Sequence, residues 1–338
     1  MAIIGNGLIV VSAPFLISPV SPYLKLCISL AAADMWAASL LITGLMVNSY
    51  LPVVIGVQKS SKCVDAWLEM FRVSGMLTSD MHLFALAINQ FFGTMWPLKY
   101  KARRLLLQPW RVGKGVSLYG FQVMVTTRRI RAIVLGLWIV PLLFVFCWFI
   151  SGENDGLRHE RCHMFFYNRF PFRITIFLIF IVPLVATLFI YGLILSKLLK
   201  AKAEFEMTVS DRRTSMRRSN VHSKLKLVWT TLLIVSTFSL SWGLCVLYFV
   251  LVCVDGCPFT YNVSLNFYLG LFLNSTVNCL VMLKLASNPF IYTLRIRAIK
   301  TSVDTFLAAL FHRKTYPTKN SKSNAALLSS SSGPLQSL

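Results

Sequence analysis

The chain contains seven long stretches of mostly apolar residues, and this pattern restricts its fold more than any other feature. A helix that crosses the hydrocarbon layer of a bilayer needs about 20 such residues. Of the 338 residues, 56% are hydrophobic and 14% are charged, a balance that a soluble domain cannot accommodate in its core. We therefore predict an all-α integral membrane protein, a seven-helix bundle with spans near residues 2–17, 26–50, 67–92, 132–150, 172–196, 227–252 and 266–292.

The basic residues alternate between the two sides of this predicted bundle. Of the 34 Lys and Arg residues, 26 occur before residue 26, in 93–131, in 197–226 and after 292, which are every second connection. Cytoplasmic loops of multispanning proteins carry such an excess, so we expect a cytoplasmic C-terminus and an N-terminus outside. The net charge of +22 would otherwise suggest nucleic acid. Charge interleaved with apolar spans instead predicts contact with membrane lipid and no nucleic-acid partner.

The chain divides into three predicted segments. Residues 1–292 form the seven-transmembrane bundle, 293–312 a short amphipathic eighth helix on the membrane surface, and 313–338 a disordered cytoplasmic tail rich in Ser, Asn and Lys. The amphipathic helix places six apolar residues near one face: Leu294, Ile296, Ile299, Val303, Phe306 and Leu307. The first span is short, and we interpret it as a truncated helix, with a signal-peptide core as the alternative.

Nearly every span carries a short motif. The motifs are Gly5-Asn6 with Val10, Leu30 with Asp34, Ala87-Ile88-Asn89-Gln90-Phe91 followed by Pro97-Leu98-Lys99-Tyr100, Trp138, Pro183 with Tyr191, Phe238 with Trp242, and Asn288-Pro289-Phe290-Ile291-Tyr292. Their order and spacing resemble those of the rhodopsin-like (class A) G-protein-coupled receptor family over residues 3–310. The resemblance implies a plasma-membrane receptor that transmits binding of a small extracellular ligand to a heterotrimeric G protein, with no cofactor and no catalytic activity. No HExxH, GxSxG or phosphate-loop motif suggests an enzyme.

The resemblance also implies ligand-binding residues near the outer side of the bundle. It implies three ligand contacts and one disulfide: Arg72, Trp242, Tyr268, and the pair Cys63 and Cys162. Amine receptors of the family carry an Asp eighteen residues before the arginine of their DRY motif, and counting back from Gln90 gives Arg72. A cation there disfavours an amine ligand and favours an anion, unless Asp80, deeper in the same span, binds the amine. The alternative for Arg72 is a side chain that snorkels to the outer surface.

A polar core inside the spans resembles the family's sodium site. Its members are Asp34, Ser79, Lys284 and Asn288. A carboxylate at this depth costs several kcal/mol unless it is partnered, so we expect the Lys284 ammonium to reach Asp34 and replace the sodium. The alternative is that Lys284 points into a water-filled cavity. An opsin is disfavoured, because its Schiff-base lysine would lie six residues before Asn288, where this chain has Met282.

The cytoplasmic ends of the spans carry the family's activation switch in an altered form. Its members are Asn89, Gln90, Tyr191, Phe238, Pro289 and Tyr292. Gln90 lacks the guanidinium fork of the usual arginine, and Lys224 stands where many relatives carry an acid, so the usual ionic lock cannot form. The usual Pro of span six is also missing, although Gly243 softens the helix there. We expect reduced or absent G-protein coupling; a non-signalling heptahelical decoy or partner protein and a transporter are the alternatives.

Three smaller features complete the sequence-based expectations. The segment 101–125 is longer than relatives need for their second inner loop, and it is either a genuine loop or a gene-model artefact. Cys253 and Cys257 fit a small outer-loop disulfide, and Asn262-Val263-Ser264 fits a glycosylation site in the third outer loop.

Overall fold

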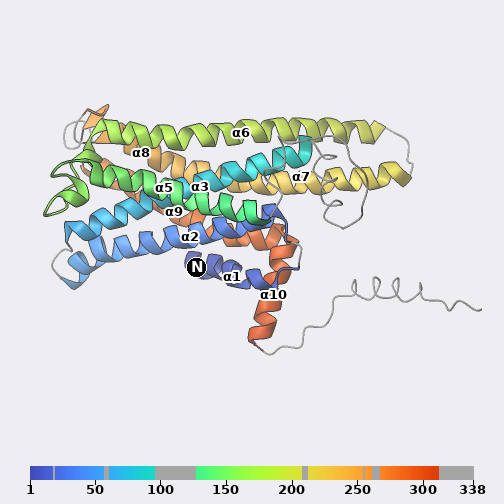
Figure 1. The fold of residues 1–338 in the computed structure, drawn as a ribbon, viewed down its shortest axis with the longest axis horizontal. Coiled ribbons are helices and arrows are strands. Elements are labelled where there is room, and N and C mark those ends of the chain that lie inside the picture. Colours follow the sequence, from blue (N-terminus) through green and yellow to red (C-terminus); the bar gives the residue numbers. More distant parts are fainter. Residues whose placement is uncertain are drawn as a thin grey trace, which may run out of the picture.

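The computed structural model (Figure 1) describes residues 1–17, 20–56, 61–95, 127–207, 212–253, 256–260 and 267–311. The long segment at 101–125, the tail at 313–338 and Asn262 fall outside these ranges. The helices follow one another as α1 (Ala2–Ser12), α2 (Pro22–Leu45), α3 (Lys62–Met95), α5 (Thr127–Ser151), α6 (Phe170–Met207), α7 (Arg212–Phe238), α8 (Leu244–Leu251), α9 (Phe267–Arg295) and α10 (Arg297–Leu310).

Shorter elements extend or connect these helices. Helix α1 ends in the 3₁₀ turn η1 (Ala13–Phe15), and α2 continues as the π-helical segment η2 (Met46–Ile55). The π-helical turn η6 (Ser239–Gly243) joins α7 to α8, so that these three elements form the sixth span. The connection after α5 contains the 3₁₀ turns η4 (Gly156–Arg158) and η5 (Phe166–Asn168), and β1 (Val252–Cys253) pairs in parallel with β2 (Phe259–Thr260).

The predicted seven-helix bundle with an eighth helix is confirmed. Five stretches of the described chain are long and apolar enough to cross a membrane: Pro22–Pro52, Arg128–Ser151, Phe170–Glu204, Val221–Leu251 and Tyr268–Arg295. The other two spans are α1 and α3. Helix α1 has 11 residues, which at 1.5 Å per residue reach about 16 Å, or about half of a bilayer's hydrocarbon thickness. Helix α3 carries charged residues, but it lies in the centre and packs on α2, α5 and α6.

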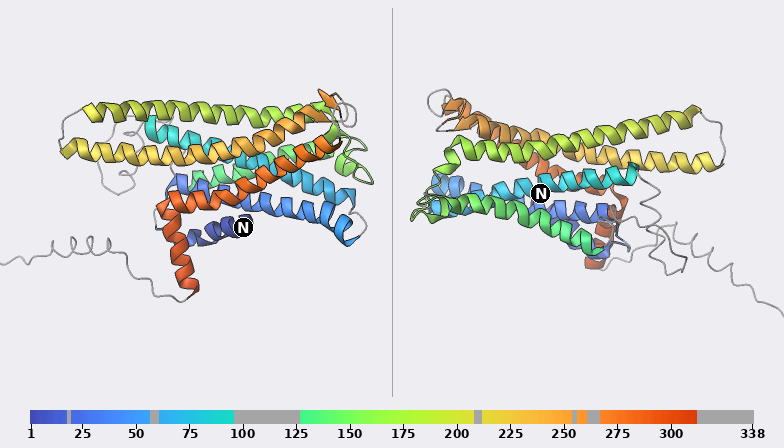
Figure 2. Two further views of the ribbon diagram at one scale, coloured as in Figure 1. Left: turned by 180° about the vertical axis from the view of Figure 1, so that it is seen from behind. Right: turned by 45° about the horizontal axis from the view of Figure 1, so that its top comes forward.

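The two ends of the bundle differ in chemistry. We call one the disulfide end, because it holds the bonds Cys63–Cys162 and Cys253–Cys257, both of which the sequence predicted. The opposite, basic end holds the N-terminus of α2, the C-terminus of α9 and the long extensions of α6 and α7, which project beyond the other helices in Figure 2. These extensions exceed the predicted spans, because adding residues to an existing helix is far easier than starting a new one.

Helix α10 turns sharply away from α9 at the basic end and packs against α1 (Figure 1). Its buried face contains Ile299 and Val303, and the rings of Phe306 and Phe15 meet edge to face with centroids 5.6 Å apart. The predicted apolar face is therefore largely correct. Leu294 is the exception, since it belongs to α9 and is 78% exposed.

Candidate functional site

The predicted polar core joins α2 to α9 in the interior of the bundle. Lys284 Nζ lies 2.5 Å from Asp34 Oδ1, and Asn288 Nδ2 donates to Asp34 Oδ2 over 2.5 Å. The Asp34 side chain is fully buried and that of Lys284 is 2% exposed. Buried charges persist when they are paired and hydrogen-bonded, so each of these charges stabilises the other. The structure brings together three of the four predicted polar-core residues.

The fourth predicted member, Ser79, is buried on α3, but both oxygens of Asp34 are met by side chains of α9. A neighbouring network that the sequence analysis missed links α2, α3 and α5. Ser29 Oγ lies 2.7 Å from His82 Nε2 and accepts from Trp138 Nε1 over 3.0 Å. His82 Nδ1 donates to the carbonyl of Thr78 over 2.7 Å, so its Nε2 accepts from Ser29. Only Trp138 carried a sequence signal.

Pro289 interrupts the hydrogen bonding of α9 beside this core. Proline has no N–H, so the carbonyl four residues earlier, that of Leu285, loses its helical donor. Asn6 Nδ2 replaces the donor, over 3.1 Å. Gly5 permits this close approach of α1, because a Cβ at that position would lie 2.9 Å from Pro289 Cβ and Cγ. The Gly5-Asn6 motif and Pro289 are therefore two sides of one contact.

A small cavity lies at the disulfide end between α3, α6 and α8. Its volume is about 30 Å³, room for one or two water molecules. The predicted ligand contacts Arg72 and Trp242 both line it. Apart from Arg72 and Tyr167, the remaining lining residues are hydrophobic: Val73, Met76, Ile176, Trp242, Cys245, Val246 and Phe249.

The charge of Arg72 is compensated inside this cavity wall. Its Nη2 and Nε lie 2.6 Å and 2.9 Å from Glu69 Oε2, one turn earlier on α3. Tyr167 donates to the same carboxylate over 2.9 Å and accepts from Arg72 over 3.2 Å. Burial and the negative charge of Glu69 raise the pKa of Tyr167, which keeps its hydroxyl protonated. The pairing with Glu69 reduces the positive charge that Arg72 can offer to the anionic ligand expected from the sequence.

Tyr268, the third predicted ligand contact, does not join the other two. It lies at the disulfide end of α9, is 77% exposed and is not among the residues that line the cavity. The register of α9 turns this side chain away from the interior, while the opposite face presents Lys284 and Asn288. Neither hydropathy nor motif spacing specifies how a helix is rotated at its outer end.

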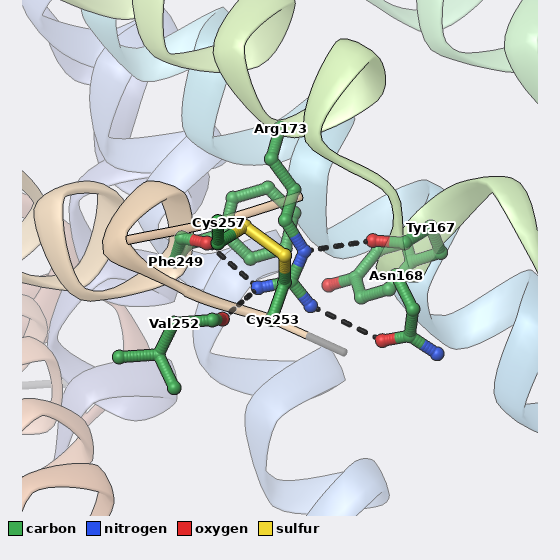
Figure 3. The surroundings of a disulfide bond; sticks show 7 residues. All are labelled: Tyr167, Asn168, Arg173, Phe249, Val252, Cys253 and Cys257. Atoms are coloured by element: carbon green, nitrogen blue, oxygen red, sulfur yellow. Dashed lines mark hydrogen bonds between the residues drawn. A yellow bond between two sulfur atoms is a disulfide. The ribbon is translucent and has the colours of Figure 1, made fainter. Parts of the chain in front are cut away.

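Arg173 holds the wall of the cavity together (Figure 3), and the sequence analysis did not single it out. The side chain is buried, 3% exposed. It donates to the carbonyls of Tyr167, over 2.9 Å, and Phe249, over 2.6 Å, to the carbonyl of Val252, and to Asn168 Oδ1 over 3.1 Å. The guanidinium carbon also lies 4.3 Å from the centre of the Phe249 ring.

The location of Arg173 explains why a cation suits it. One of its acceptors, the carbonyl of Phe249, lies in the last turn of α8, where carbonyls carry the negative end of the helix dipole, and another, that of Val252, directly follows the helix. The disulfide Cys253–Cys257 lies beside it and closes the segment that follows α8 (Figure 3). Arg173 therefore connects α6, η5 and α8 around a cavity that Tyr167 and Phe249 line.

The sixth span contains a π-helical turn at the position where its relatives carry a proline. Its π-helical turn η6 places Trp242 at the cavity. Ser241 Oγ donates to the carbonyls of Thr237, over 2.8 Å, and Phe238, over 3.2 Å. Hydroxyls that bond to backbone carbonyls bend helices, and π-turns often mark functional positions. The Ser241 hydrogen bonds and the π-turn thus interrupt the regular α-helix in place of the missing proline.

The predicted switch residues at the basic end are buried and linked by uncharged groups. Gln90 Nε2 donates to Thr231 Oγ1 over 2.8 Å, and Tyr23 Oη lies 3.2 Å from the same hydroxyl. Thr231 therefore joins α7 to both α2 and α3. Lys224 Nζ donates to the carbonyl of Gly93 over 3.0 Å, which adds a second link between α7 and α3. Asn89 is 6% exposed beside Gln90.

The other predicted switch residues lie between the contacts of Gln90 at the basic end and the cavity at the disulfide end. Phe238 stacks on Phe180, with ring centroids 5.7 Å apart, and Lys284 Nζ lies 5.2 Å from the Phe238 ring centre. Tyr191 and Tyr292 are fully buried, and their hydroxyls have no hydrogen-bond partner among the described residues. Buried hydroxyls normally find a partner or a water, so these two suit a second arrangement of the helices or bound water.

Comparison with known proteins gives one family match. The family model described as 7 transmembrane receptor (rhodopsin family) matches residues 116–292, just over half of the chain, and its last matched residue is Tyr292. No curated protein matches. Across the described ranges, no three His, Cys, Asp or Glu side chains group to hold a metal ion. The family consists of membrane receptors and not of enzymes. By its helix arrangement, its disulfides, its Asn288–Tyr292 motif and this match, the chain belongs to the rhodopsin family of seven-transmembrane receptors.

Proposed function

We propose that this receptor transmits the binding of a small ligand, other than a typical amine, to a heterotrimeric G protein, and that its coupling is weaker than in relatives with an arginine at the position of Gln90. The disulfide end faces the outside of the plasma membrane, because disulfides persist in oxidising spaces. The basic end faces the cytoplasm, where loops carry the excess of Lys and Arg.

The hydrogen bond between Gln90 and Thr231 carries this proposal. Together with Tyr23, it holds α7 against α2 and α3 in the arrangement described above, which we call closed. A bond between uncharged groups stabilises by about 0.5–1.5 kcal/mol net, and bonds to a charged group are about twice as strong. When α7 moves outward, Gln90 offers the G protein a neutral amide in place of a guanidinium. The coupled state is then stabilised less than in relatives.

The ligand enters at the cavity lined by Arg72, Tyr167 and Trp242. Small-molecule sites usually enclose about 300–1,000 Å³, far more than the 30 Å³ found here. Ligand binding therefore requires the wall held by Arg173 to open, which couples the ligand to a change between two helix arrangements. Because Glu69 already compensates Arg72, the cavity favours a neutral, mainly apolar ligand.

The polar core takes part in the same two-state change. In this proposal the Lys284 ammonium replaces the sodium ion that relatives bind beside the aspartate of span two. A tethered cation cannot leave when the helices rearrange. Its contact with Asp34 therefore affects the equilibrium between the two helix arrangements equally at every salt concentration. The effect of a bound sodium ion, in contrast, would depend on the sodium concentration.

The experiment measures G-protein activation in cells for the wild type and for the Asn89→Asp/Gln90→Arg double variant, with surface expression quantified for both. We expect the double variant to signal more strongly, basally or with pools of extracellular small molecules. Ser196→Arg is the matched control, because it adds a cation on an exposed position of α6 at the basic end without entering the contact with Thr231.

The outcomes separate this proposal from the second candidate, a heptahelical protein that does not signal. The altered Asn89-Gln90 pair favours that candidate as well, because it lacks the charge that meets the G protein. If both proteins reach the surface and neither signals, the chain is a heptahelical protein that does not signal, and flux assays then separate a decoy or partner protein from a transporter. If the wild type already signals as strongly as the double variant, Gln90 does not weaken coupling.

A further inference from the structure

A large groove lies on the lipid-facing side of the basic end. It runs between α6, α7 and the C-terminal end of α9, and its volume is about 640 Å³. Three helices contribute to its walls: Leu199 and Lys202 come from α6, Lys226, Trp229 and Leu233 from α7, and Arg295 from α9. The groove does not overlap the cavity near Trp242, which lies at the other end of the bundle.

The walls of this groove change from basic to apolar along the membrane normal. Lys226 and Leu233 are seven residues apart on α7, which corresponds to about 10 Å along the helix axis. Lys226 therefore lies nearer the rim of the groove, and Leu233 lies deeper, toward the hydrocarbon layer. Trp229 lies between them and is 56% exposed, a position that suits the preference of tryptophan for the membrane interface.

Two cations of the groove, Lys226 and Arg295, carry positive charge that no acidic residue of its walls neutralises. None of its lining residues is acidic. Among the residues that the structure describes, neither Lys226 nor Arg295 forms an ion pair. A ligand that fits both parts of the groove needs a negative head at the rim and a long apolar body beside the tryptophan.

We propose that this groove binds an anionic phospholipid, with the phosphate of its headgroup on Lys226 and Arg295 and an acyl chain along Trp229 and Leu233. The inference rests on the proposed orientation, because anionic lipids concentrate in the cytoplasmic leaflet and attract basic segments there. A lipid in the groove contacts α6, α7 and α9 together. It therefore makes the position of α7, and with it the contact of Gln90 with Thr231, depend on membrane composition.

The test uses brominated acyl chains, which quench nearby tryptophans. The purified full chain is placed in nanodiscs that contain either brominated phosphatidylserine or brominated phosphatidylcholine, and the signal of Trp229 is the difference between the wild type and Trp229→Phe. We expect phosphatidylserine to quench Trp229 at a lower mole fraction. The preference falls about fivefold for each cation removed in Lys226→Gln and Arg295→Gln.

The matched control is Lys200→Gln/Lys300→Gln, which removes two exposed cations at the same end that do not line the groove. We expect this control variant to keep the wild-type preference for phosphatidylserine over phosphatidylcholine. Equal loss in the control and in Lys226→Gln/Arg295→Gln overturns the proposal in favour of general surface attraction, and equal quenching by both lipids in the wild type overturns it outright. Displacement by inorganic phosphate assigns the groove to a free anion.

Two further measurements keep the test independent of folding and of orientation. Quenching by brominated phosphatidylcholine stays unchanged in the variants if they fold, because it needs no charge. Both leaflets of a nanodisc have the same composition, so the result does not depend on which end faces the cytoplasm. Accessibility of a C-terminal tag in intact cells tests the orientation separately.

Discussion

Replacing Lys284 by Met tests the physical basis of the polar core. The substitution keeps the approximate volume of the side chain but removes the ammonium that lies 2.5 Å from Asp34 Oδ1. Among the residues that the structure describes, Asp34 then keeps Asn288 as its hydrogen-bond donor, inside a bundle where the carboxylate has no access to bulk water.

The structure sets the scale of the effect. With an effective dielectric constant of about 20, two unit charges separated by the observed distance attract by about 7 kcal/mol. Desolvation of the two ions costs several kcal/mol each and offsets most of this attraction. Removing one partner leaves the other desolvated, so we expect Lys284→Met to destabilise the receptor by about 3–5 kcal/mol. The double variant Asp34→Asn/Lys284→Met buries no charge and should regain most of the lost stability.

The assay is thermal unfolding of the purified receptor in detergent, with sodium or potassium as the cation. The wild type should have the same Tm in both salts if, as proposed, the Lys284 ammonium replaces the sodium ion beside Asp34. Lys284→Met should have a lower Tm and should gain stability selectively from sodium. A wild-type Tm that rises in sodium relative to potassium refutes the internal-ammonium proposal, and a double variant as unstable as Lys284→Met refutes the energetic argument.

Three further predictions follow from individual contacts. Gly5→Ala places a Cβ 2.9 Å from the proline ring of α9 and should destabilise the receptor by about 1–3 kcal/mol in thermal unfolding. Gly44→Ala is the control, because its Cβ meets nothing within 4 Å. Equal Tm values for the two variants would contradict this prediction. Arg173→Lys removes the guanidinium fork that reaches several acceptors, and each acceptor left unsatisfied costs about 1–3 kcal/mol. The substitution should therefore speed hydrogen exchange at the C-terminal end of α8. Unchanged exchange there would show that Arg173 does not stabilise this end of the helix. Desolvation and the nearby Lys62 ammonium lower the pKa of His163, so the folded receptor binds this proton less readily than the unfolded chain. The contribution of neutral His163 to the free energy of unfolding is complete above about pH 6.5 and is lost as the pH falls toward the lowered pKa of the folded state. His163→Gln should therefore flatten the dependence of Tm on pH. An unchanged profile would exclude His163 as the source of that dependence.

The sequence by itself determined the seven-helix bundle and predicted which connections share an end of it. Because a bilayer offers no hydrogen bonds to the backbone, an apolar stretch of sufficient length must become a helix, and the alternation of Lys and Arg then separates the two ends. Motifs with fixed spacing also located the buried pair of Asp34 and Lys284 and the disulfide Cys63–Cys162, although the residues of the first pair lie 250 positions apart.

Only the tertiary structure decided which way side chains face and which partners they meet. Hydropathy does not fix the rotation of a helix in a chain that is apolar on every side, so Tyr268 was expected to line the cavity and instead faces outward. The contacts of Arg173 and Thr231 join three elements each, and such contacts depend on distances between helices that no local pattern encodes. Arg72 differs in another way. Glu69 stands only three residues away, but whether the pair forms depends on the space that Tyr167 and the neighbouring helices leave for it.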